Sequence, residues 1–90
     1  MPSGYVFTTR EELDTAVDLW ISNADFAART YGDINTWDVN AITDFSKLFK
    51  DKTTFNSDIS NWDVSAGNNF NRMFANASSF NQDIRKWDCL

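Results

Sequence analysis

A strict internal repeat constrains this chain more than any other feature. Trp37, Trp62 and Trp87 are evenly spaced, with 62 − 37 = 25 and 87 − 62 = 25, and no insertion separates the copies. Many other residues recur at the same interval: Asp33, Asp58 and Asp83; Ile34, Ile59 and Ile84; Asp38, Asp63 and Asp88; Phe45 and Phe70; Phe49 and Phe74; Phe55 and Phe80. Coincidence at so many positions predicts equivalent coils that lie one on another, with like residues in columns.

The apolar residues within each copy predict the type of coil. Leucine-rich repeats have periods of roughly 20–29 residues and an L-x-x-L-x-L pattern. The corresponding residues here are Ile34-x-x-Trp37-x-Val39, Ile59-x-x-Trp62-x-Val64 and Ile84-x-x-Trp87-x-Cys89. The pattern predicts an α/β fold, namely a right-handed leucine-rich-repeat-like solenoid of about three helix–strand units with a short parallel sheet.

Local signals place the elements of this solenoid. Each Trp-x-Val piece predicts a short strand, and apolar residues at helical spacing predict helical turns over 42–49 and 70–77. Asn40 and Ser65 stand where the N-caps of these two helices are expected. Ahead of the repeats, Thr9 and Glu12 form a capping-box pattern at the start of an amphipathic helix. We expect that helix to cap the N-terminal end of the stack.

The length of 90 residues suits a single domain. We divide residues 1–90 into an N-terminal cap helix and crossover (1–30), a first repeat (31–54), a second repeat (55–79) and a partial third repeat (80–90). The repeats predict a structural core that consists of Ile34, Trp37, Val39, Ile59, Trp62, Val64, Ile84, Trp87, Phe45, Phe49, Phe70 and Phe74. A ligand-stacking role is the other interpretation of the tryptophan column, but its place in the apolar pattern favours the core.

Composition argues against several classes of function. The formal net charge is −5, so nucleic acids and anionic lipid surfaces are disfavoured partners. No stretch approaches the roughly 20 apolar residues that span a bilayer, and the first residues show no secretion signal. The chain has no histidine and a single cysteine, Cys89, which removes histidine-activated nucleophiles and the usual zinc ligands. We therefore expect no catalytic residues, no metal site and no cofactor.

The repeat sequence resembles that of a known family. The strings Phe55-Asn-Ser-Asp58-Ile-Ser-Asn-Trp62-Asp-Val-Ser65 and Met73-Phe-Ala-Asn-Ala77-Ser-Ser-Phe80-Asn-Gln-Asp-Ile84 are similar to the repeat of the BspA-like leucine-rich-repeat surface proteins, also described as mycoplasma-type lipoprotein repeats of unknown function. The resemblance runs from Tyr31 to Cys89 and departs from the pattern at Gly67, Asn68 and Phe70. It implies a cell-surface or secreted protein that binds other proteins, and it brings no catalytic residue with it.

The candidate partner-binding residues lie on the concave face that the predicted strands turn outward. They are Thr36, Asp38, Asn61, Asp63, Lys86 and Asp88. The column of Asp38, Asp63 and Asp88 has three interpretations. Each carboxylate accepts hydrogen bonds from amides of its own turn, the column is an acidic stripe for a basic partner, or it binds a calcium-like cation through its oxygens.

Two functions follow from these expectations. The first is a non-catalytic protein-protein interaction or adhesion module, with a protein partner that the sequence does not specify. The alternative is a structural unit that self-associates by stacking through an open C-terminal strand, whose backbone donors and acceptors are unpaired.

Overall fold

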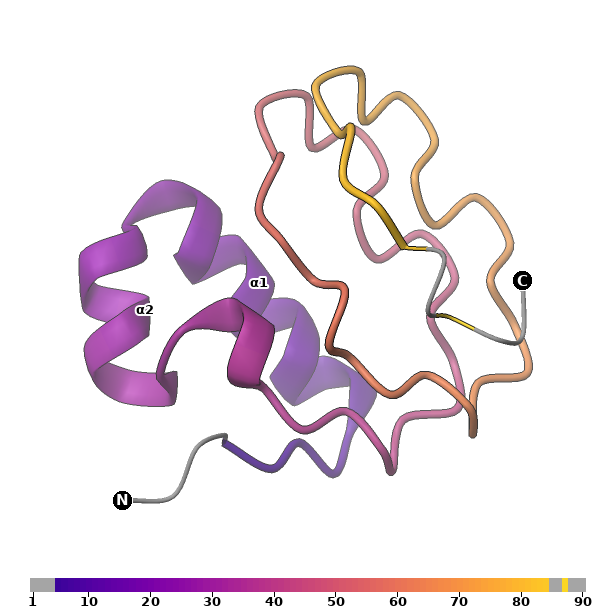
Figure 1. Cartoon of the computed structure of the whole chain (residues 1–90), viewed down its shortest axis with the longest axis horizontal. Helices are drawn as coiled ribbons and strands as arrows, with labels where there is room; N and C mark the ends of the chain where they lie inside the picture. Colours follow the sequence, from indigo (N-terminus) through magenta and orange to yellow (C-terminus); the bar gives the residue numbers. More distant parts are fainter. Residues whose placement is uncertain (1–4, 85–86, 88–90) are drawn as a thin grey trace.

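Two short helices precede the repeats. In the computed structural model, which describes residues 5–84 and 87, α1 spans Arg10–Ser22 and α2 spans Ala24–Tyr31 (Figure 1). The Thr9 hydroxyl accepts a hydrogen bond from the Glu12 amide at 3.2 Å, as the capping-box pattern predicts. The Glu12 carboxylate in turn accepts from the Thr8 amide at 3.4 Å, one residue earlier than the usual partner.

A single residue separates the two helices. The Asn23 amide donates to the Leu19 carbonyl, and the Asn23 side chain accepts from the Phe26 amide at 3.2 Å, so Asn23 ends α1 and caps α2. Gly32 ends α2 with a φ of 82°, a left-handed conformation that favours glycine. A 3₁₀ helix, η1, then spans Ile34–Thr36 and begins the first repeat.

The predicted α/β solenoid with a parallel sheet is wrong. Over residues 5–84 and at Trp87 the structure has no strand, only isolated parallel bridges of Val6 with Asp38 and of Asp44 with Asn69. The segments 37–39 and 62–64 do not pair as strands because aspartate side chains turn the chain there. Asp38 and Asp63 each accept from the amide two residues on, and such local bonds compete with a strand ladder. The regular secondary structure of the described residues is therefore helical.

The helices predicted over 42–49 and 70–77 are also wrong. In their place the chain makes successive tight turns, in which an amide donates to the carbonyl three residues earlier. Lys47, Asp51, Arg72 and Asn76 have φ values of 61°, 63°, 58° and 60°, which a right-handed helix excludes. Lys47 and Arg72 are one repeat apart, as are Asp51 and Asn76, so the two copies share this backbone. Asn40 and Ser65 cap no helix; their amides donate to Asp38 and Asp63 instead.

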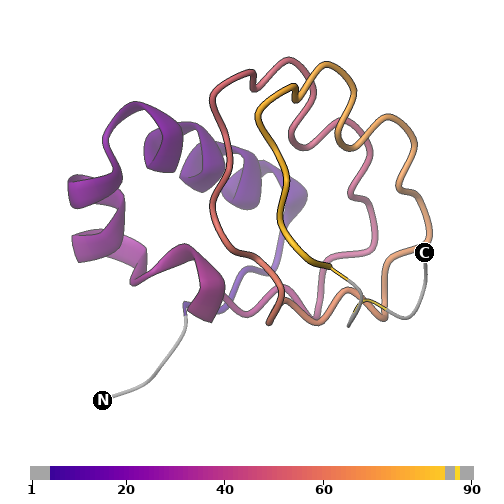
Figure 2. The ribbon, with the colours of Figure 1, turned by 45° about the horizontal axis from the view of Figure 1, so that its top comes forward.

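The turns of successive copies pair through the main chain. We call residues 34–58 the first coil and residues 59–83 the second coil; Figure 2 shows them side by side. Four alternate amides of the first coil donate to the second at 2.8–3.0 Å: Phe45 to Asn69, Lys47 to Asn71, Phe49 to Met73 and Asp51 to Ala75. One bond runs in the other direction, from the Asn68 amide to the Thr43 carbonyl. In an α-helix these amides would donate to carbonyls of the same segment; here they donate to the second coil and so join the two coils.

Like aromatic side chains stack on one another from coil to coil. The ring centroids are 5.3 Å apart for Phe45–Phe70, 5.5 Å for Phe49–Phe74, 5.8 Å for Phe55–Phe80, 6.3 Å for Trp37–Trp62 and 6.5 Å for Trp62–Trp87. The rings of all five pairs lie within 20° of parallel. Offset or stacked aromatic contacts stabilise a core beyond the area that they bury.

The helices close one side of this stack. Leu13, Ala16 and Val17 of α1 are fully buried, and Trp20 meets Trp37 edge to face at 5.9 Å. In Figures 1 and 2 the helices lie on one side of the first coil and the second coil lies on the other. The helices thus cover the side of the first coil that faces away from the second coil.

Candidate functional site

The acidic residues of the predicted face belong to local turns. The Asp38 carboxylate accepts from the Asn40 amide at 3.0 Å, and the Asp63 carboxylate accepts from the Ser65 amide at 3.0 Å. Asp33 and Asp58 make the same contact with the amides of Asn35 and Ser60. Each aspartate therefore shapes its own turn, which is the first of the three interpretations of the column.

Hydrogen bonding keeps the Asp63 carboxyl ionised. Bonds from the side chain and the amide of Ser65 lower the pKa of Asp63 below its ordinary value of 3.8. Asp63 is exposed, so its charge is presented to solvent in an orientation that the turn defines. Asp38 is half-buried, because the main chain of residues 5–7 pairs beside it: the Asp38 amide donates to the Tyr5 carbonyl and the Phe7 amide donates to the Asp38 carbonyl.

Of the other predicted contact residues, two are exposed and the rest lie outside the described residues. Thr36 and Asn61 are exposed, and the Thr36 hydroxyl donates to the Asp33 carbonyl at 2.6 Å. The Asn61 amide donates to the Asn35 side chain at 3.0 Å, a bond between successive coils. Lys86, Asp88 and Cys89 lie outside the described residues. Asn61 and Asp63 are thus exposed residues near the start of the second coil, and Thr36 is an exposed residue near the start of the first coil.

The tryptophan column is inside the molecule. Trp37, Trp62 and Trp87 are 2%, 3% and 5% exposed, so their faces are covered by protein. Each indole N–H donates to a main-chain carbonyl: Trp37 to Gly32, Trp62 to Ile34 and Trp87 to Ile59. Of the remaining predicted core, Ile34, Val39, Ile59, Val64, Phe45 and Phe49 are buried, whereas Phe70, Phe74 and Ile84 are half-buried and pack against it.

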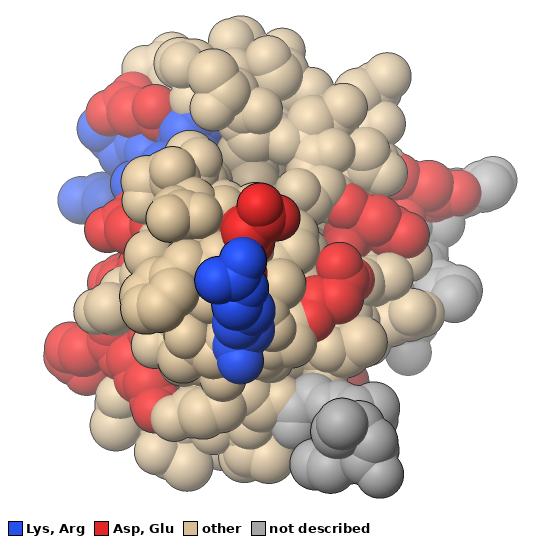
Figure 3. Space-filling model, turned by 90° about the vertical axis from the view of Figure 1, so that its left-hand side faces the viewer, with Lys and Arg blue, Asp and Glu red and all other residues tan. Residues whose placement is uncertain are grey.

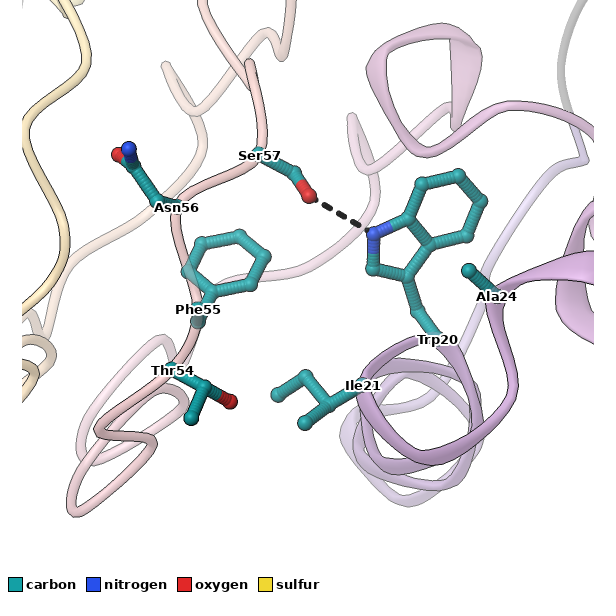
Figure 4. A pocket seen from close by; sticks show the side chains of 7 residues that line it. All are labelled: Trp20, Ile21, Ala24, Thr54, Phe55, Asn56 and Ser57. Atoms are coloured by element: carbon teal, nitrogen blue, oxygen red, sulfur yellow. Dashed lines mark hydrogen bonds between the residues drawn. The ribbon is translucent and has the colours of Figure 1, made fainter.

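A small pocket opens between the helices and the first coil. Its volume is about 210 Å³, and its walls are Trp20, Ile21 and Ala24 on one side and residues 54–57 on the other (Figure 4). The Trp20 indole N–H crosses the gap and donates to the Ser57 hydroxyl at 2.9 Å. Asn56 points away from Trp20 in this view. Pockets for drug-sized ligands measure roughly 300–1,000 Å³, so this one suits a smaller group.

Among the charged side chains on the helix-bearing side of the surface, acidic ones cover more of the view than basic ones, as Figure 3 shows. Among residues 5–84 and 87, no three histidine, cysteine, aspartate or glutamate side chains are grouped so that they could hold a metal ion. In the same part of the chain, no helix has the length and apolar character needed to cross a bilayer.

These features define a small repeat domain with two helices ahead of the repeats and an acidic surface. Residues 20–90 match the model of the family described as "Mycoplasma protein of unknown function, DUF285". The match covers most of the chain, and the protein belongs to this family. No curated protein and no solved structure matches the chain. The narrower assignment to the BspA-like leucine-rich-repeat proteins is not supported by these comparisons.

One exposed feature, the outer edge of the second coil, has no signal in the residue pattern. This edge is formed by main-chain amides, whose directions follow from the positive φ of Arg72 and Asn76. Arginine is an uncommon residue in this conformation, so no residue type marks the edge in advance. Trp20 belongs to α1, and it is half-buried and lines the pocket.

Proposed function

We propose that this domain is a non-catalytic protein-interaction module that binds a basic protein surface through its acidic face. The predicted contact residues of that face within the described chain are Thr36, Asp38, Asn61 and Asp63. The observation that supports the proposal is the state of Asp63: its carboxylate is exposed, oriented by Ser65, and has a lowered pKa. Fixed charges of one sign steer a partner of opposite charge and favour its binding.

The chemistry of these carboxylates supports a binding role over a catalytic one. A catalytic alternative would need a pair of acids such as Asp58 and Asp63. A general acid needs a raised pKa, whereas the pKa of Asp63 is lowered. Both side chains are exposed, and both accept hydrogen bonds from the amides of their own turns. The resemblance to BspA-like surface repeats, some of which resemble adhesins, is consistent with binding to another protein.

The alternative of self-assembly through an open C-terminal strand has less support. The described residues contain no strand, and most of the segment that would form it, 87–89, lies outside them. Sedimentation over a concentration series tests this alternative directly, because stacking would raise the apparent mass with concentration.

A charge-removing substitution that keeps the turn tests the proposed function. The probe is a short lysine-rich peptide, with a glutamate-rich peptide of equal length as the control, and binding is followed by fluorescence anisotropy. We expect Asp63→Asn to weaken binding about two- to fivefold, because a single ion pair at an exposed site contributes only modestly to affinity. We also expect binding to weaken as salt is added.

Asparagine is a matched substitution at this position because the chain already uses it in the same way. Asn69 accepts from the Asn71 amide at 3.0 Å through its side-chain oxygen, in a turn of the same kind. Asp63→Ala, which removes the acceptor as well, reports on the turn itself. If Asp63→Asn leaves both affinity and salt dependence unchanged, the acidic face is not the binding surface.

A further inference from the structure

Along the turn segments from residue 45 to residue 51, the main-chain hydrogen bonds between the two coils all run the same way, from donors on one coil to acceptors on the other. Every donor amide there belongs to the first coil and every acceptor carbonyl belongs to the second. An ordinary strand edge alternates donors with acceptors, so it presents both to a neighbour. Here the backbone instead directs a row of amides toward the second coil.

The second coil repeats this backbone conformation. The Met73 amide donates to the Phe70 carbonyl at 3.1 Å, as the Leu48 amide does to the Phe45 carbonyl at 3.3 Å. The φ of Arg72 is 58°, against 61° for Lys47 in the first coil. Equal backbone angles give equal directions, so the alternate amides of the second coil point away from the first coil.

These outward amides have no partner in the part of the chain that the structure describes. Within residues 5–84 and 87, no hydrogen bond is donated by the amides of Phe70, Arg72, Phe74 and Asn76. We call these four amides, with the outer faces of the Phe70 and Phe74 rings, the donor edge. The corresponding rings of the first coil, Phe45 and Phe49, are fully buried, whereas Phe70 and Phe74 are half-buried. In Figures 1 and 2 the orange segment that contains these residues lies on the side of the stack away from the helices.

We propose that the donor edge binds a further coil of this repeat type, supplied by a partner chain. This inference rests on the proposed interaction role and names a second surface for it. A row of donors requires a row of acceptors, and the acceptor side of this repeat provides one, as the carbonyls of Asn69, Asn71, Met73 and Ala75 show. The contact between the first and second coils is thus the template for the proposed interface. Aromatic residues four apart on the partner would stack on Phe70 and Phe74, as those stack on Phe45 and Phe49.

An intact second copy of this protein is a poor occupant of the donor edge. Two donor edges facing each other would oppose amide to amide, which leaves every donor unpaired. The acceptor side of the first coil lies against α1, where the Arg10 guanidinium donates to the Asp44 carbonyl at 3.2 Å. An ion pair of 2.9 Å between Asp18 and Lys52 holds the same two elements together. The partner segment must therefore present the repeat without a helical cap.

Hydrogen exchange of individual amides tests the proposal. The probe is a peptide with the sequence of residues 65–84, which contains the acceptor side of the second coil, added to the ¹⁵N-labelled full chain. At a peptide concentration of about ten times the dissociation constant, we expect exchange at residues 70, 72, 74 and 76 to slow about tenfold, because bound and free states exchange. The amides of residues 45, 47, 49 and 51, already paired within the chain, should change little.

Matched control peptides distinguish aromatic stacking on the donor edge from nonspecific peptide binding. The same peptide with Phe70→Ala and Phe74→Ala should lose most of the protection, and so should a scrambled peptide. The proposal is overturned if saturating peptide leaves the four amides unprotected, or if the parent and double-alanine peptides protect them equally. It is also overturned if these amides become protected as the protein is concentrated without peptide, since the occupant is then a second copy. If the four amides stay unprotected while the lysine-rich peptide still binds in an Asp63-dependent way, the donor edge alone is rejected. If the four amides are protected while binding of the lysine-rich peptide does not depend on Asp63, the acidic face alone is rejected.

Discussion

The indole N–H of Trp62 donates a 2.7 Å hydrogen bond to the main-chain carbonyl of Ile34, 28 residues earlier. Trp62 is 3% exposed and Ile34 is 1% exposed, so water does not reach this bond. Trp87 makes the equivalent bond to the Ile59 carbonyl at 3.2 Å. The tryptophan column therefore joins successive coils by directed hydrogen bonds as well as by stacked rings.

Replacing Trp62 with phenylalanine should destabilise the fold strongly. The variant Trp62→Phe loses this hydrogen bond and leaves a small cavity, whereas the Ile34 carbonyl still accepts from the Trp37 amide. We therefore expect the free energy of unfolding to fall by about 1–3 kcal/mol. Urea denaturation followed by circular dichroism measures the change. Trp20→Phe is the control, because Trp20 is half-buried and its indole bonds only the Ser57 hydroxyl. Equal losses for the two variants would show that the inter-coil bond has no special role.

Gly67 is required by the phenylalanine stack. A Cβ atom at this position would lie 2.5 Å from Phe70 Cζ and 2.9 Å from Phe45 Cδ2. Both rings are held in the stacked pair, so neither can move freely, and we expect Gly67→Ala to destabilise the protein by about 1–3 kcal/mol. Asn68→Ala, at the neighbouring exposed position, should change the stability much less. A thermal unfolding series that ranks the two variants in the opposite order would contradict the packing argument.

Lys47 adopts a left-handed conformation that costs a residue with a side chain more than it costs glycine. Its φ is 61°, and it is exposed, so little packing would be lost with its side chain. We expect Lys47→Gly to stabilise the fold by about 0.5–1 kcal/mol, after allowance for the greater freedom of glycine in the unfolded chain. Lys50→Gly, three residues on and absent from the residues with positive φ, should destabilise it. Denaturant titration measures the free energy of unfolding of both variants. A Lys47→Gly variant less stable than the parent would show that the left-handed conformation of Lys47 does not cost the fold stability.

The stability should fall in acid. Hydrogen bonds from Ser46 lower the pKa of Asp44, those from Asn76 and Lys50 lower the pKa of Asp51, and those from Ser65 lower the pKa of Asp63, each from an ordinary value of 3.8. A lowered pKa in the folded state stabilises the fold above the unfolded value and loses this effect as pH falls through the folded value. The urea midpoint should therefore change little between about pH 7 and pH 5 and decline below about pH 4.

An asparagine variant isolates one of these carboxyls. Asp44→Asn cannot titrate, and Asn69 occupies the equivalent place in the second coil with the same turn contact. We expect this variant to lose less stability than the parent between neutral and acid pH. Asn68→Ala, an exposed change that removes no titratable group, is the control and should lose as much stability in acid as the parent. Identical curves for Asp44→Asn and the parent would show that this carboxylate does not couple to folding.

The periodic and apolar features of the fold could be predicted well from the sequence. The repeat interval indicates which residues stack, because the coils follow one another without insertion, so Trp37 lies over Trp62 and Phe49 over Phe74. The capping-box pattern locates the start of α1 at Arg10. These features depend on burial and on contacts within a few residues, which a linear pattern records directly.

The secondary structure of the repeats could not be predicted in the same way. Apolar spacing over 42–49 fits a helix, but the Phe45, Phe49 and Asp51 amides bond to the next coil instead of to their own. Asp38 and Asp63 favour turns over strands, and nothing in the pattern shows which of the competing bonds is stronger. The acidic candidates and their possible engagement in turns could be identified, but the folded geometry was needed to show that Asp38 and Asp63 make these turn contacts.

Residue type and spacing alone fix the repeat, the aromatic columns, the negative charge and the helix that precedes the coils. The folded arrangement is needed to show that the coils join through turns and that their amides point in one direction. It is also needed to show that, among the residues that the structure describes, a row of amides of the second coil has no hydrogen-bond partner. This division arises because a backbone amide finds its partner by position in space, and both a helix and a neighbouring coil can satisfy it equally well.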